Sequence, residues 1–152
     1  MTAIRRYSLT MLLLALASSY GAAKDETVDE LKARVESARL EDRPELCIRI
    51  AQHQLRNADK LYTEGQVEQA RDAVDDIVTY SEKARDAALQ TKKRLKNVEI
   101  DVRKIADKLR DIKRTIAFDD QPPVERAIRR LEDIRTTLLK EMFAKENKKE
   151  KK

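Results

Sequence analysis

Turn-forming and aromatic residues are scarce in this chain. Its 152 residues include two glycines, three prolines, four tyrosines, two phenylalanines and no tryptophan. A β-sheet domain places glycine and other turn formers at its many reversals, so this scarcity excludes a sheet-rich fold. Charged residues make up 40% of the chain, and such a composition is typical of long helices and coiled coils. We therefore expect an all-α fold.

Residues that carry catalysis or bind metals are also few. His53 is the only histidine, and the chain has no cysteine cluster and no glycine-rich phosphate loop. His53 lies off the apolar face of its predicted helix and lacks partners for general-base chemistry, so we interpret it as solvated or loosely packed. The adjacent aspartates at 75–76 and 119–120 point apart on a helix or cap. The sequence predicts no enzyme activity, no metal and no cofactor.

Cys47 is the only cysteine and has two interpretations. In an exported protein it could join two chains or remain a reactive thiol, with its pKa lowered by the first turn of a helix. A free cysteine is more often a small buried side chain, and we favour that interpretation.

The first 23 residues have the pattern of a secretory signal. Arg5 and Arg6 precede an apolar run at 9–17, and the small residues "SSYGAA" follow. We predict cleavage after Ala23 and export to the periplasm or the exterior. The apolar run is shorter than the roughly 20 residues of a membrane span, so no span is expected after the signal is removed.

The basic charge of the chain is concentrated at its two ends. Residues 1–23 hold two arginines, and the tail at 145–152 holds five lysines and two glutamates. Subtracting these from the 33 basic and 28 acidic residues leaves 26 of each in residues 24–144, the predicted helical domain. A neutral domain gives no electrostatic argument for nucleic-acid binding. We expect the lysine-rich tail to be disordered and solvated.

Local signals divide the start of the domain into two helices. "TVDE" at 27–30 has the spacing of a capping box and predicts a helix over 27–40. Pro44 suits the first turn of a second helix, which continues to about Thr63. Gly65 can adopt the left-handed conformation that ends many helices.

The longest pattern in the chain covers 66–118. Apolar or small residues recur there at alternating intervals of three and four, and no glycine or proline interrupts them. This pattern predicts one continuous helix roughly 80 Å long. "DDQPP" at 119–123 stops it, and a last helix is expected over 124–143. If the shorter helices fold back on the long one, the product is an elongated antiparallel bundle or coiled coil built on one long central helix.

Residues 58–82 resemble the helix-turn-helix of a tetratricopeptide repeat. The resemblance rests on Leu61, Tyr62, Gly65, Ala70 and Val74. A repeat array needs a second copy about 34 residues further on, where a glutamate replaces the turn glycine inside the predicted long helix. The resemblance therefore implies a single helical hairpin, and no peptide-binding residues are carried over from the family.

The predicted helix at 124–143 has an apolar face wider than one partner helix covers. We therefore expect this face to dock a second copy of the chain or another helical protein. The candidate interface residues are Ile128, Leu131, Leu138, Leu139, Met142 and Phe143.

Residues 92–114 contain ten basic and four acidic side chains. This excess could attract anionic envelope material, or it could be a solvated helix flank balanced by Glu125, Glu132 and Asp133. The candidate anion-binding residues are Lys92, Lys93, Arg94, Lys96, Arg103 and Lys104. No aromatic residue lies among them, so a stacking platform for nucleic acid is not expected.

Two functions follow from these patterns. The favoured one is an exported, non-catalytic helical scaffold or adaptor that mediates protein association. The alternative is a peripheral binder of anionic envelope surfaces that uses 92–114 and the lysine tail.

Overall fold

The computed structural model describes residues 26–149, and side chains as far as residue 144. The predicted signal sequence and its cleavage site lie outside the described residues. The elements in chain order are α1 (Val28–Ser37), α2 (Arg43–Thr63), α3 (Val67–Thr91), α4 (Leu95–Thr115), a 3-10 turn η1 (Phe118–Asp120) and α5 (Gln121–Lys149). No strand occurs within the described part, so the expected all-α fold is confirmed.

The helix starts follow the local signals in the sequence. The Thr27 hydroxyl accepts a hydrogen bond from the Glu30 N–H at 3.2 Å, and the Glu30 carboxylate accepts one from the Thr27 N–H at 2.8 Å. This is the predicted capping box, which satisfies two backbone donors that the helix leaves open. Pro44 lies in the first turn of α2, where its missing N–H costs nothing.

Gly65 ends α2 with a left-handed backbone, at φ +74°. The Gln66 N–H donates to the Leu61 carbonyl at 2.8 Å, and the Gly65 N–H donates to the Tyr62 carbonyl at 3.1 Å. These two bonds form a Schellman motif. The tight turn reverses the chain, and α3 returns along α2 as the sequence predicts.

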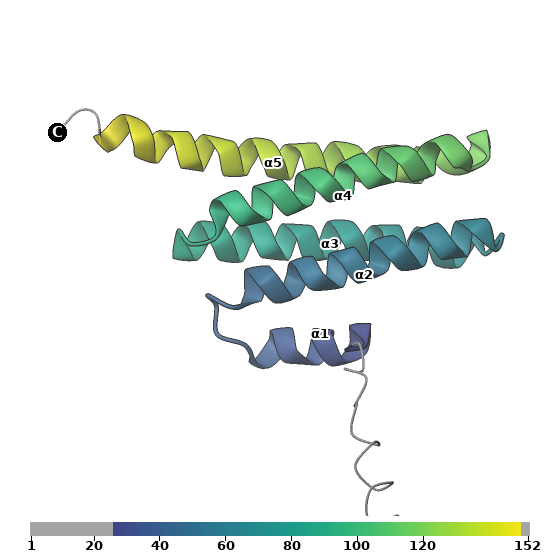
Figure 1. Ribbon diagram of the computed structural model, residues 1–152, viewed down its shortest axis with the longest axis horizontal. Helices are drawn as coiled ribbons and strands as arrows, with labels where there is room; N and C mark the ends of the chain where they lie inside the picture. The colour runs from purple at the N-terminus through teal and green to yellow at the C-terminus, as the bar shows by residue number, and fades with distance from the viewer. Residues whose placement is uncertain (1–25, 150–152) are drawn as a thin grey trace, which may run out of the picture.

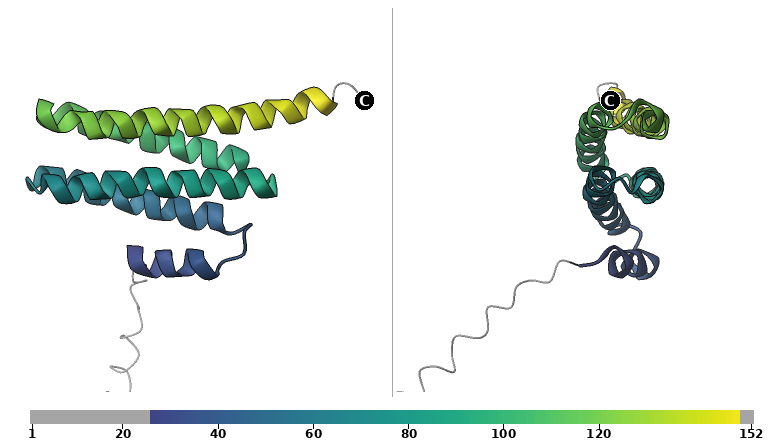
Figure 2. Two further views of the ribbon diagram at one scale, coloured as in Figure 1. Left: turned by 180° about the vertical axis from the view of Figure 1, so that it is seen from behind. Right: turned by 90° about the vertical axis from the view of Figure 1, so that its right-hand side faces the viewer.

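The helices form two antiparallel hairpins, α2–α3 and α4–α5, stacked side by side (Figure 1). Seen end on, α2 and α4 make one layer, and α3 and α5 make the other (Figure 2). The shorter α1 lies at the edge of the stack against α2. Most of the largest buried side chains, including Ile50, Ile77, Leu109 and Leu131, come from the four long helices.

The prediction of one continuous helix over 66–118 is wrong. Helix α3 ends at Thr91 and α4 begins at Leu95, and between them Lys92 and Arg94 both have left-handed backbones, with φ of 57° and 59°. The long-central-helix architecture is therefore wrong as well. The three-and-four spacing runs unchanged through the turn, so periodicity gave no sign of the break.

Burial explains why the chain reverses at this turn. A left-handed backbone at a residue other than glycine costs roughly 1–2 kcal/mol. Folding back places the α4–α5 hairpin against α2 and α3, where Val102, Ile105 and Leu131 are 0–1% exposed. Each such side chain contributes roughly 1.5–3 kcal/mol on burial, so a few of them offset the strain of the turn.

We expect Arg94→Gly to raise the free energy of unfolding by about 0.5–1 kcal/mol. Glycine relieves the left-handed strain, and this gain exceeds the small loss of an exposed ion pair between Arg94 and Glu45. Urea denaturation measures the change. Lys104→Gly, at an exposed position inside α4, is the control and should cost about 1 kcal/mol. An equal loss from both variants would favour the continuous helix.

Candidate functional site

Three of the candidate anion-binding residues lie at the α3–α4 turn and already have acidic partners. Three ion pairs connect the turn to the segment just before α2, to the first turn of α2 and to the C-terminal part of α5. These pairs are Lys92–Glu141 at 3.0 Å, Lys93–Glu41 at 2.7 Å and Arg94–Glu45 at 2.7 Å. The hydrogen bond from Lys93 lowers the pKa of the Glu41 carboxyl. All three pairs are at least partly exposed, so each contributes little to the stability of the turn.

The other three candidates lie on the outer face of α4. Lys96, Arg103 and Lys104 are exposed, as is the neighbouring Lys108. None of the four is in an ion pair with another described side chain. Beyond the turn, the positive charge predicted over 92–114 is therefore exposed along α4.

Nearer the C-terminal end of α4, two basic residues are paired with acids on α5. Arg110 pairs with Glu132 at 2.6 Å, and Lys113 pairs with Glu125 at 3.0 Å. Two of the three predicted balancing acids, Glu125 and Glu132, therefore pair with α4, whereas Asp133 is exposed on α5 and forms no ion pair with another described side chain. The hydrogen bond from Lys113 lowers the pKa of Glu125. Both pairs cross between the antiparallel helices α4 and α5.

The pair formed by Glu99 and Arg135 was not expected from the sequence. Glu99 is 7% exposed and accepts hydrogen bonds from Nε and Nη2 of Arg135 at 3.0 and 2.9 Å. Arg135 also binds Glu132 at 2.8 Å. Burial acts to lower the pKa of Arg135, but the two carboxylates outweigh it and raise that pKa. The one available signal was a charged residue at an inward-facing position between Leu95 and Val102.

The apolar face of α5 is divided between the core and the surface. Leu131 and Leu138 are fully buried because α3 as well as α4 covers α5. The expectation that these two residues form an exposed interface is therefore wrong. Of the other candidates, Ile128, Leu139 and Met142 are half-buried, and Phe143 is 57% exposed.

Helix α5 also extends past its partner helices. The ion pair between Lys92 and Glu141 places residue 141 beside the α3–α4 turn, and α5 continues to Lys149. Its last turns project beyond the ends of α3 and α4 (Figure 2). Phe143 lies at the start of this projection, beside the half-buried Leu139 and Met142.

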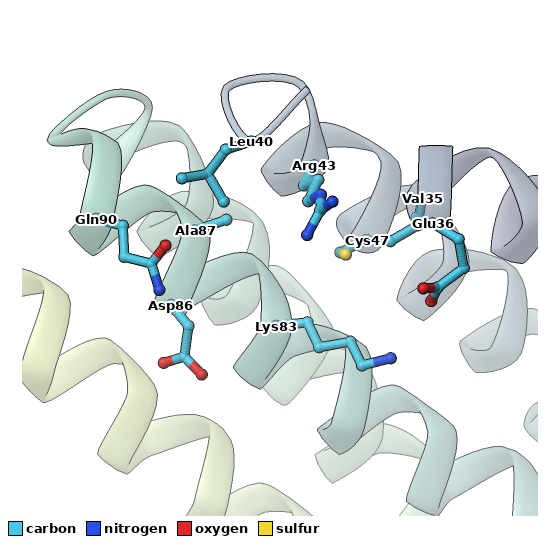
Figure 3. Close-up of a pocket in the computed structure, with 9 residues that line it drawn as sticks. All are labelled: Val35, Glu36, Leu40, Arg43, Cys47, Lys83, Asp86, Ala87 and Gln90. Carbon is cyan, nitrogen blue, oxygen red and sulfur yellow. The ribbon is translucent and has the colours of Figure 1, made fainter. Parts of the chain in front are cut away.

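Cys47 lies at the base of a groove of about 340 Å³ between α1, α2 and α3 (Figure 3). Its side chain is 1% exposed, and burial raises the pKa of the thiol to about 11. The interpretation of Cys47 as a small buried side chain is confirmed, and the pKa shift is opposite to that of a reactive thiol. The rim carries Leu40 together with both acidic and basic side chains, so it has no consistent charge. His53 is half-buried on α2.

A polar cluster connects helix α1 to the α2–α3 hairpin. Asp76 accepts hydrogen bonds from Lys32 Nζ at 2.7 Å and from Gln54 Nε2 at 2.6 Å. The bond to Asp76 raises the pKa of Lys32, whose ammonium also lies 5.4 Å from the Tyr80 ring centroid. Asp75 is exposed, so these adjacent aspartates point apart as predicted.

Neither a metal site nor a membrane-crossing helix is found in the described part of the chain. No three His, Cys, Asp or Glu side chains among residues 26–144 are placed to hold a metal ion. Within the same described region, no helix is long and apolar enough to span a bilayer. No protein-family model, curated protein or solved structure matches this chain.

Proposed function

We propose that the protein is an exported, non-catalytic helical adaptor that associates with a protein partner through the C-terminal part of α5. The observation that carries the proposal is the exposure of Phe143, at 57%, where α5 projects beyond the stack. Together with the half-buried Leu139 and Met142 it forms an apolar patch on the C-terminal part of α5. Aromatic and methionine side chains are enriched in protein interfaces.

The partner that fits this patch is a second helix, from another copy of the chain or from another helical protein. Leu139 and Phe143 are four residues apart, so they lie on one face of α5. Spacing of this kind presents a stripe that a facing helix can cover. Association through it buries apolar surface, so it should be insensitive to salt.

We expect the double variant Leu139→Glu/Phe143→Glu to abolish this association and to leave the fold intact. Association would be opposed because the two new carboxylates would have to be desolvated at the interface. The fold should tolerate them because both residues lie outside the fully buried core. Sedimentation velocity measures the association, and far-ultraviolet circular dichroism measures the helix content.

Thr136→Glu/Thr137→Glu is the matched control, because it places the same charges on exposed positions of the same helix. The control should associate like the unmodified protein. A stable monomer of the unmodified protein at high concentration would contradict self-association, and the proposal would then require a different helical partner for the patch.

A second candidate function is peripheral binding to anionic envelope surfaces. It is favoured by the exposure of Lys96, Arg103 and Lys104, none of which has an ion-pair partner among the described side chains. Vesicles that contain phosphatidylglycerol should then retain the protein at low salt and release it as salt is added. Equal retention by neutral vesicles would contradict this function.

A further inference from the structure

The two halves of the stack have opposite charge. Residues 26–91, which form α1, α2 and α3, contain 10 basic and 15 acidic side chains. Residues 92–144, which include α4 and most of α5, contain 15 basic and 10 acidic side chains. In Figure 1, α1 lies at one edge of the stack and the α4–α5 hairpin lies at the opposite edge. The domain as a whole is neutral, but its negative and positive charges are separated along the direction in which the helices stack.

The acidic edge presents a regular stripe on α1. Asp29, Ala33 and Glu36 are all exposed, and their spacing of four and three places them on one face of the helix. Neither carboxylate forms an ion pair with another described residue. The two carboxylates are separated by two helical turns, about 10.5 Å along the axis, with a small methyl group between them.

The basic edge carries a stripe with the same spacing on α4. Lys96 and Arg103 are exposed, and Ile100 between them is half-buried. The two cations are also seven residues apart, so the axial distance is again about 10.5 Å. Opposed helices could therefore bring both charge pairs together while Ile100 contacts Ala33, whose small side chain permits a close approach of the two backbones.

We propose that the α4 stripe of one copy packs against the α1 stripe of a second copy, head to tail. The two stripes belong to opposite edges of one chain, so the contact is heterologous and leaves one free stripe on each terminal copy. Repeated contacts of this kind would stack the copies along the same direction in which the helices of one chain are stacked. This contact goes beyond the association proposed for α5 and does not depend on it.

Charge reversal on each stripe tests the contact. Sedimentation is measured at about 0.01 M salt, where the Debye length is about 30 Å, and at about 0.15 M, where it is about 8 Å. We expect the weight-average mass of the unmodified protein to rise at least about twofold at the lower salt. Asp29→Lys/Glu36→Lys alone and Lys96→Glu/Arg103→Glu alone should each remove this rise.

A mixture of the two charge-reversed variants gives the decisive test, because their altered stripes are complementary to each other. The mixture should recover the low-salt mass, which a variant that had failed to fold could not do. Lys104→Glu/Lys108→Glu changes the net charge of α4 by the same amount outside the stripe, and it should keep the rise. This control separates the stripe from a general effect of charge.

Three results would overturn the contact: no rise in mass at low salt, loss of the rise in the control variant, or a mixture that does not recover. Association that persists at high salt and is removed by Leu139→Glu/Phe143→Glu supports the α5 interface alone. The two associations therefore fail independently.

Discussion

Leu138→Ala is expected to lower the free energy of unfolding by about 2–5 kcal/mol, the range for a buried leucine. The Leu138 side chain is 0% exposed, in a helix that packs against both α3 and α4. Removing it leaves a cavity that the surrounding helices fill only in part. Urea denaturation at a protein concentration where the chain is monomeric measures the loss.

Leu139→Ala is the matched control on the adjacent residue. Leu139 is only half-buried, so its truncation should cost less than about 1.5 kcal/mol. Equal and small losses for the two variants would mean that the chain does not bury the face of α5 that contains Leu138. That face would then be free for a partner, as the sequence pattern alone suggested.

Glu99→Ala is expected to cost about 2 kcal/mol, because it removes one partner of a largely buried ion pair. Arg135 keeps its bond to Glu132, which holds the loss below that of a charge left fully unpaired. A double-mutant cycle with Arg135→Ala should give a coupling of about 1–2 kcal/mol. Thermal or urea unfolding of the four proteins supplies the cycle.

The exposed pair of Asp111 and Arg114 on the same helix provides the comparison. Its side chains are 59% and 73% exposed, and Asp111→Ala should change the stability by less than about 0.5 kcal/mol. If both substitutions on α4 have equally small effects, burial of the Glu99–Arg135 pair does not make it more important for stability than an exposed pair.

The parts of the fold that depend on neighbouring residues could be predicted from the sequence. The capping box at Thr27, the proline start of α2 and the glycine turn at Gly65 each depend on a few adjacent residues with distinctive chemistry. Their hydrogen bonds form within one turn of the chain, so the local pattern determines them.

The reversal at the α3–α4 turn could not be predicted in this way. Lys92 and Arg94 adopt left-handed backbones that the sequence would assign to glycine or asparagine. The burial that outweighs this strain comes from contacts between hairpins far apart in the sequence. The coverage of α5 was predicted wrongly for the same reason, since a continuous helix would leave α3 too distant to bury Leu138.

The candidate surfaces could likewise be predicted only in part from the sequence. Composition identified the excess of positive charge on α4, but only the packing separates Lys93, which is paired with Glu41, from Lys96 and Arg103. The role proposed for Asp29 and Glu36 depends on α1 lying at the edge of the stack opposite the α4–α5 hairpin.

In the proposed function, α5 closes the core of its own chain with one part and binds a partner with the other. Amide hydrogen exchange along α5, followed over a range of protein concentrations, tests this most directly. We expect the amides at 131–138 to be protected at every concentration. Those at 140–149 should gain protection only as the protein associates, and not in Leu139→Glu/Phe143→Glu. Protection at 131–138 that arises only on association would contradict the claim.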